Sequence, residues 1–146
     1  MRMKYSTLLL ALVAAAVPAA AQDQAEHPAI RQAMLDYIDG FYTGDSTLLV
    51  RSVSPEVIKY GYWKNGPEAE YVGEPMSYEQ IVHNPTRPPR ERPGAPREAT
   101  VLDAEAQVAS GKVRAWWGID YILLAKENGR WMIRQVLWQG PLGTVR

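Results

Sequence analysis

The chain of 146 residues contains no cysteine, only two histidines and a single phenylalanine. Without cysteine no disulfide can form, so the hydrophobic core alone must stabilise the fold. With His27 and His83 as the only imidazoles, a zinc site is not expected. Basic and acidic residues number 16 each, and such a near-neutral chain lacks the positive surface that nucleic-acid binding needs. The sequence has neither a nucleophile motif nor an acid–base pair at motif spacing, and these absences favour binding over catalysis. No cofactor is expected.

The first residues have the composition of a secretory signal peptide. Arg2 and Lys4 precede an apolar run of ten residues, 8–17, and Ala19-Ala20-Ala21 supplies the small residues of a cleavage site. The run is too short to span a bilayer, and no cysteine follows it, which excludes a lipoprotein anchor. An uncleaved membrane anchor is the alternative interpretation.

We therefore expect residues 1–21 to be removed and residues 22–146 to form a single domain in the periplasm or outside the cell, with no membrane attachment. That domain carries 14 basic and 16 acidic residues, a net charge of −2. Its length is sufficient for one hydrophobic core.

Helix and strand signals alternate along the first half of this domain. Residues 22–27 are expected to be flexible, and Pro28 suits the first turn of an amphipathic helix that ends at Gly40–Gly44. Asp45 is a natural cap for a second short helix, which Ser54-Pro55 should end. The remaining elements expected here are a strand at Glu56–Trp63, a short strand near Glu70–Val72, and a third helix through Val82, opened by a capping box at Ser77–Gln80.

A segment rich in proline and arginine follows, at about residues 84–97. It contains five prolines and four arginines, and proline neither continues a helix nor donates to a sheet ladder. The segment is therefore expected to be an exposed loop. It is either a simple connector or a lid or partner-binding motif.

Three further strands are expected at the end of the chain, at about Ala99–Val108, Lys112–Lys126 and Arg130–Gln139, with a turn at Ser110-Gly111 and a bend at Gly118. Asn128-Gly129 is a strong signal for a two-residue hairpin turn, because both residues tolerate positive φ. Such a turn predicts that Leu124 pairs with Ile133, Ile122 with Gln135, and Asp120 with Leu137. One face would then carry Asp120 and Gln135 among apolar side chains, unless a bulge of one residue shifts the register.

Helices on one face of an antiparallel sheet define an α+β fold. Several short motifs also resemble the nuclear transport factor 2-like superfamily, and more narrowly its bacterial putative lumazine-binding branch. They are Tyr37-Ile38-Asp39-Gly40, Gly44-Asp45, Ser54-Pro55, Asp120-Tyr121-x-x-Leu124 and Asn128-Gly129-Arg130-Trp131-x-Ile133. The resemblance covers about residues 25–139. It implies a cone-shaped, curved antiparallel sheet wrapped around the N-terminal helices, a cystatin-like roll with a pocket at its wide end, and dimerisation through the outer sheet face.

Asp120 is the leading candidate for a site residue. Burial would raise its pKa, which suits a general base, and the alternative is a structural carboxylate bonded to a backbone amide or an arginine. Gln135 could orient a ligand carbonyl or be a rim residue. Tyr37 could donate to an oxyanion or be a core tyrosine bonded to a backbone group or to Asp120. His83 could shuttle protons or interact with a helix C-terminus.

Aromatic residues complete the expected pocket. Trp116 and Trp131 should point to the concave side and suit a flat ligand. Tyr60 shares one face of the first strand with Tyr62, while Lys59, Gly61 and Trp63 share the other, and either set could line the cavity. On the outer face we expect Met132, Val136, Trp138, Trp117, Ile119, Tyr121, Leu123 and Ala125, with Arg134. A homodimer, or the C-terminal tail Pro141–Arg146, would cover them.

Three functions follow from this sequence. The first is a small-molecule-binding domain with an apolar, aromatic-lined pocket. The second is an isomerase, cyclase or dehydratase that uses Asp120 as base with Tyr37 or His83 as polarising group. The third is a dimeric protein-association domain.

Overall fold

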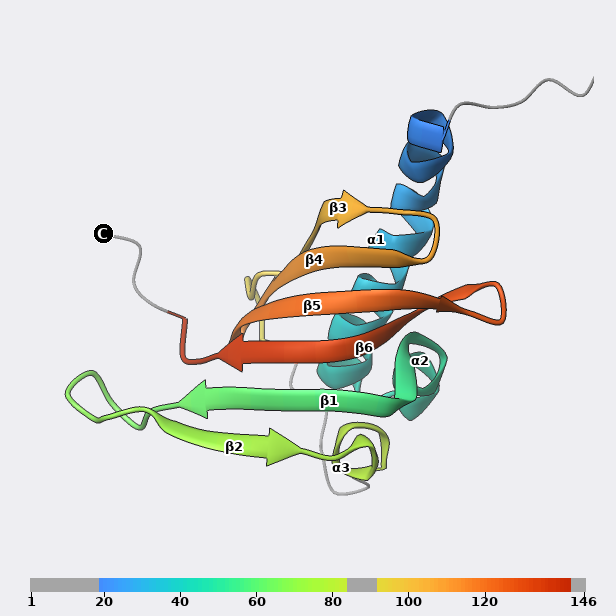
Figure 1. Ribbon diagram of the computed structural model, residues 1–146. Helices are drawn as coiled ribbons and strands as arrows, with labels where there is room; N and C mark the ends of the chain where they lie inside the picture. The colour runs from blue at the N-terminus through green and yellow to red at the C-terminus, as the bar shows by residue number, and fades with distance from the viewer. Residues whose placement is uncertain (1–18, 84–91, 143–146) are drawn as a thin grey trace, which may run out of the picture.

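A long helix packs across one face of a curved six-stranded sheet in the computed structural model, which describes residues 19–83 and 92–142 (Figure 1). The helices are α1 (Ala19–Thr43), α2 (Ser46–Ser52) and α3 (Tyr78–Val82). The strands are β1 (Val53–Trp63), β2 (Val72–Met76), β3 (Glu98–Ala104), β4 (Val108–Ala115), β5 (Gly118–Glu127) and β6 (Arg130–Gln139). No helix in the described ranges is long and apolar enough to cross a membrane.

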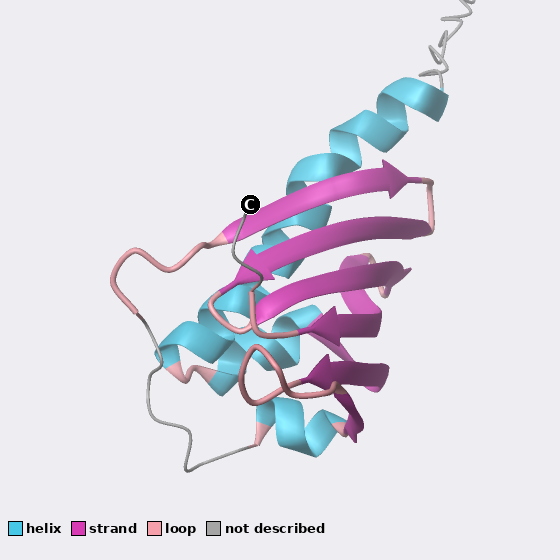
Figure 2. Cartoon of the chain, turned by 90° about the vertical axis from the view of Figure 1, so that its left-hand side faces the viewer, coloured by secondary structure: helices cyan, strands magenta, loops and turns pink. Residues whose placement is uncertain are grey.

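The α+β class and the curved sheet over the N-terminal helix are confirmed (Figure 2). The strand order is β2-β1-β6-β5-β4-β3. All neighbouring strands are antiparallel except β1 and β6, which run parallel, so the expectation of a wholly antiparallel sheet was wrong. Because β1 and β6 run in the same direction, their C-terminal ends lie at the same edge of the sheet, and this edge holds the candidate site.

Helix α1 begins earlier than predicted. Residues 22–27 are helical and Pro28 lies inside the helix, so the expected flexible segment is an error. Glu26 ties the N-terminal part of the helix to β5 and β6, because its carboxylate accepts hydrogen bonds from Lys126 Nζ at 2.9 Å and from Trp131 Nε1 at 2.7 Å. These hydrogen bonds lower the pKa of Glu26, the Lys126 bond most. Residues 1–18 of the expected signal peptide lie outside the described residues.

The inner face of α1 supplies the centre of the core. Ile30, Met34, Tyr37 and Ile38 are fully buried and recur at helical spacing. Each such side chain contributes about 1.5–3 kcal/mol by leaving water. Gly111 on β4 permits the close approach of this helix, since a Cβ there would lie 2.3 Å from Met34 Sδ.

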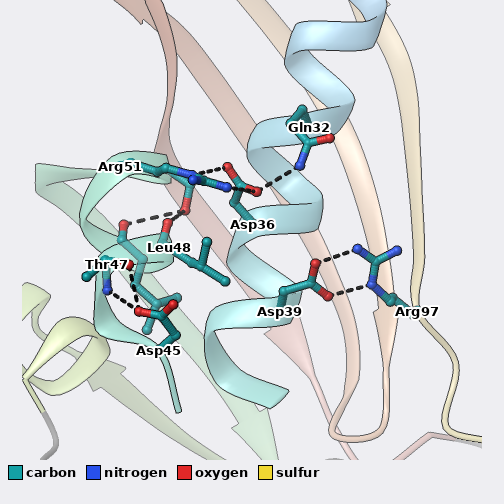
Figure 3. Close-up of polar contacts among 10 residues, drawn as sticks. Gln32, Asp36, Asp39, Asp45, Thr47, Leu48, Arg51 and Arg97 are labelled. Carbon is teal, nitrogen blue, oxygen red and sulfur yellow. Dashed lines mark hydrogen bonds and ion pairs between the residues drawn. The ribbon is translucent and has the colours of Figure 1, made fainter. Parts of the chain in front are cut away.

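Short polar contacts fix the smaller helices, as their sequences predicted. Asp45 caps α2 by accepting from the Thr47 amide at 2.8 Å, and Ser77 and Gln80 form the predicted capping box of α3. Figure 3 shows Asp36 of α1 accepting two hydrogen bonds, each 2.7 Å long, from the Arg51 guanidinium. This bidentate pair ties α2 to α1.

The end of the Pro/Arg segment is tied to α1 as well. Arg97 forms a bidentate ion pair with Asp39 (Figure 3), and the Tyr42 hydroxyl donates to the carbonyl of Pro96. Residues 84–91, the remainder of this predicted loop, lie outside the described residues. The described part is mostly exposed, as predicted, and only its end at Pro96 and Arg97 is held against the helix.

The region between β3 and β5 differs from its prediction. Ser110-Gly111 lies inside β4, and the turn falls earlier, where the Glu105 amide donates to the Val108 carbonyl at 2.8 Å. The bend expected at Gly118 is instead a complete reversal, so one predicted strand is the antiparallel pair β4–β5. Trp116 and Trp117 form this reversal, and Gly118 adopts a φ of 151° that favours glycine.

The β5–β6 hairpin has the predicted turn but contains a bulge. Asn128 and Gly129 have φ of 49° and 78°, and Leu124 pairs with Ile133 as expected. The next pair is Leu123 with Gln135, so Arg134 is the extra residue of a β-bulge. The predicted pairs Ile122–Gln135 and Asp120–Leu137 were therefore wrong. Ile122 faces Val136 and Asp120 faces Trp138.

This bulge moves one half of β6 to the opposite face. Asp120 remains on the inner face, while Val136 and Trp138 turn inward and are buried. Gln135 and Leu137 turn outward and are exposed. The expected outer positions of Val136 and Trp138, and the inner positions of Gln135 and Leu137, were accordingly wrong.

Candidate ligand-binding site

A cavity of about 330 Å³ lies at the edge of the sheet where β1 and β6 end and β4 turns into β5. This is the left-hand end of the sheet in Figure 1, beyond the C-terminal half of α1. Four of its eight lining residues are tryptophans. The lining residues are Phe41, Lys59, Trp63, Glu74, Met76, Trp116, Trp117 and Trp138.

The aromatic walls pack edge to face. Trp117 contacts Phe41 and Trp116 with ring centroids 5.3 and 5.8 Å apart. Such pairs add about 0.5–1.5 kcal/mol beyond the burial of their surface, so they hold the wall in one arrangement. The Tyr42 hydroxyl accepts a hydrogen bond from the Trp116 amide at 3.0 Å, which fixes the β4–β5 turn to α1.

A polar chain runs behind this wall. Lys59 of β1 donates to the Tyr37 hydroxyl at 2.5 Å, and Tyr37 donates to Asp120 Oδ2 at 2.7 Å. The other carboxylate oxygen of Asp120, Oδ1, accepts from Trp117 Nε1 at 2.7 Å. Lys59 lines the cavity, whereas Tyr37 and Asp120 lie one layer deeper and have 0% exposure.

Burial raises the pKa of Asp120 above its usual value. The positive charge of Lys59 and the hydrogen bonds from Tyr37 and Trp117 oppose this effect without cancelling it. A buried carboxylate is costly without partners, so these three groups explain how the fold accommodates it. No ligand could touch the Asp120 oxygens in this arrangement, because both already accept hydrogen bonds and neither is exposed.

The structure brings together three of the predicted site residues. Asp120 and Tyr37 are hydrogen-bonded, and Trp116 lines the adjacent cavity. The remaining four lie elsewhere. Trp131 is bonded to Glu26 near the hairpin turn, Gln135 and Tyr60 lie exposed on the outer face, and His83 is the exposed residue that ends α3.

Of the eight lining residues only Trp116 was among the predicted site residues, and either face of β1 had been left as a possible cavity wall. Lys59 faces inward with 6% exposure, together with Gly61 and Trp63, which decides the orientation of β1. Trp117 and Trp138 were expected on the outer face and instead line the cavity. Among the described residues no group of three His, Asp or Glu side chains could hold a metal ion.

This architecture, a curved sheet around a long helix with a cavity at one end, is that of the nuclear transport factor 2-like class. A model of the family described as Putative lumazine-binding matches residues 25–139, and the chain belongs to that family. No curated protein matches it.

Solved structures of the same fold come from several bacteria. A nuclear transport factor 2-like protein of unknown function from Shewanella baltica has a TM-score of 0.54 at 20% identity, covering 79% of this chain and 93% of its own. A similar protein from Silicibacter pomeroyi has a TM-score of 0.56 at 16% identity, covering 79% and 96%. A third, from Methylobacillus flagellatus, has a TM-score of 0.54 at 18% identity, covering 77% and 89%. At these identities the similarity establishes the fold alone.

Proposed function

We propose that this domain binds a small, flat and mostly apolar molecule after export to the periplasm or cell exterior and removal of residues 1–21. One observation carries the proposal of binding. Four of the five tryptophans of the chain line a single cavity of about 330 Å³. Ligand pockets commonly measure about 300–1,000 Å³ and have apolar, aromatic walls with few polar groups. The description of the family supports the same kind of activity.

Catalysis by Asp120 receives less support from the geometry. A general base must come within about 2.6–3.2 Å of the proton that it removes. Asp120 has 0% exposure, does not line the cavity, and already accepts two hydrogen bonds. Its partners Lys59 and Trp117 do line the cavity, so Asp120 is better placed to position them than to react with a ligand.

Tryptophan fluorescence tests the proposal of binding. Flat aromatic compounds that fit the cavity should quench the emission of the wild-type protein and raise its melting temperature. Trp138→Phe should reduce the quenching, because Trp138 is part of the cavity wall. Trp131→Phe is the matched control, since Trp131 lies seven residues away on the same strand, about 23 Å at ~3.3 Å per residue. A broad panel that gives neither quenching nor a thermal shift would rule out the binding function.

We further propose that two copies associate through the outer sheet face. Six large apolar or aromatic side chains there are between 39% and 67% exposed. They form rows across neighbouring strands, since Leu137 pairs with Tyr60 on one side and with Tyr121 on the other. An exposed patch of this kind is characteristic of an interface. Its members are Ile58, Tyr60, Tyr62, Tyr121, Leu123 and Leu137.

Replacing Leu137 by lysine should convert the dimer to a monomer, because a charge would be buried at the centre of this outer patch. Leu102→Lys is the control, since Leu102 is equally exposed but lies on the edge strand β3. Light scattering after size-exclusion chromatography measures both masses. A monomeric wild-type protein at micromolar concentration, or a dimer that survives Leu137→Lys, would contradict the proposed interface.

A further inference from the structure

The cavity has opposite charges at its inner end and at its mouth. Two of the residues that line it are charged, Lys59 and Glu74. Lys59 is buried, and its Nζ lies 5.0 Å from the ring centroid of Phe41 and 5.8 Å from that of Trp138. Glu74 is exposed on the edge strand β2, where water screens its charge. The inner end of the cavity is thus positive and its mouth is negative.

The indole of Trp138 lies beside Lys59, with its ring centroid 5.8 Å from Lys59 Nζ. Trp138 Nε1 is buried and has no hydrogen-bond partner among the described residues. Trp138 pairs with Gly61, two residues after Lys59 on the same inward face of β1. A Cβ at Gly61 would lie 1.8 Å from this nitrogen, so the glycine makes room for the indole. The indole nitrogen is therefore packed against β1, and Lys59 is the charged donor that a ligand in the cavity meets.

Resting on the proposed binding function, we infer that the ligand is a flat aromatic anion whose carboxylate, enolate or phenolate oxygen lies against Lys59 Nζ at the inner end of the cavity. The aromatic part of the ligand then lies between the tryptophan walls. Glu74 at the mouth reinforces this orientation, because it repels the negative end and leaves it at the inner end of the cavity.

The same arrangement couples binding to a proton. The negative charge of Asp120 compensates the positive charge of Lys59, and the Tyr37 hydroxyl connects the two groups. The groups that face Asp120 are Tyr37 from α1, Lys59 from β1 and Trp117 from the β4–β5 turn. An anionic ligand adds a second negative charge beside the same lysine. Burial already raises the pKa of Asp120, and the ligand raises it further, so the carboxylate takes up a proton as the anion binds. Affinity for an ionised ligand therefore increases as the pH falls.

A matched pair of probes tests this inference by isothermal titration calorimetry. 2-Naphthoate and 2-naphthamide have the same shape and differ in charge. Wild-type protein at pH 7 should bind the naphthoate about tenfold more tightly, since hydrogen bonds to charged groups are the stronger ones. In the double variant Lys59→Met with Asp120→Asn the preference should disappear while naphthamide still binds. Glu74→Gln should increase the affinity for naphthoate about twofold, as expected on removing an exposed charge.

Each outcome decides the question. Equal affinities in the wild type, or a preference that survives the double variant, would overturn the anionic ligand and leave the proposed binding function standing. Binding of neither probe would overturn the anionic ligand, and the fluorescence panel then decides the binding function separately. Titration in two buffers with different heats of ionisation measures the protons taken up. Zero uptake with naphthoate at pH 7 would overturn the coupling to Asp120.

Discussion

Replacing Lys59 by methionine should lower the free energy of unfolding by about 3–5 kcal/mol at pH 8, the cost typical of leaving a buried charge without its partner. Methionine preserves most of the volume of the lysine stem, so the loss reports on charge rather than on packing. The affected charge is that of Asp120, which has 0% exposure and whose nearest cation reaches it through the Tyr37 hydroxyl.

The loss should depend on pH, and its sign follows from the raised pKa of Asp120. The folded protein holds this proton more tightly than the unfolded chain, whose aspartates titrate near about 3.9. The contribution of this group to stability is therefore complete below that value and is lost as the pH rises through the folded pKa. Lys59→Met raises the folded pKa further. Urea unfolding should thus show a larger difference between wild type and variant at pH 8 than at pH 5.

Lys126→Met is the matched control. Lys126 pairs with Glu26 at 2.9 Å, but a quarter of each side chain remains exposed. Solvent screens such a pair and makes its contribution to stability small, and the pKa of Glu26 is lowered, so both partners stay charged between pH 5 and pH 8. Equal losses in the two variants, or a Lys59→Met loss that does not change with pH, would show that Lys59 does not compensate a buried carboxylate.

Local signals in the sequence were sufficient to predict much of the fold. The cap at Asp45, the capping box at Ser77 and the turn at Asn128-Gly129 each depend on residues within four positions of one another, and all three are present. The hairpin register was right from the turn as far as the Leu124–Ile133 pair. A core Tyr37 was expected to bond either a backbone group or Asp120, and it donates to Asp120.

The errors arise where contacts distant in sequence decide the structure. The bulge at Arg134 lies beside β1, whose own register with β6 shifts between Val53 and Ile58, and no pattern within the hairpin reports that parallel neighbour. The side chain of Arg134 donates to Glu56 at 2.8 Å, which favours its place in the bulge. Trp138 consequently lies inside the cavity rather than on the outer face.

The orientation of Lys59 was left open by the sequence for a related reason. Lysine is almost never fully buried unless it is paired, so a single strand sequence does not favour its inward position. Asp120 of β5 and Tyr37 of α1 compensate the burial of its charge. The sequence patterns of β5 and α1 do not show that these two residues lie next to Lys59. The site is thus assembled from three elements whose side chains compensate one another.

Gly118→Ala should have the second large effect, a loss of about 3 kcal/mol or more in the free energy of unfolding. A Cβ at this position would lie 1.9 Å from the carbonyl oxygen of Gln139 and 2.8 Å from its carbon. These are backbone atoms at the end of β6, so no side-chain rotation relieves the overlap. The φ of 151° adds strain, because residues with a Cβ rarely adopt it.

The position of Gly118 extends this effect to the binding site. The residue ends the turn that carries Trp116 and Trp117, and both line the cavity. Gly118→Ala should therefore reduce quenching by cavity ligands as well as stability. Gly66→Ala is the control, since Gly66 also has positive φ, at 110°, but a Cβ there would meet nothing within 4 Å. Gly66→Ala should lower the free energy of unfolding by only about 1 kcal/mol, through backbone strain, and should leave the quenching by ligands unchanged. Similar losses in the two variants, measured by urea unfolding, would mean that the β4–β5 turn does not depend on the close approach of its backbone to β6.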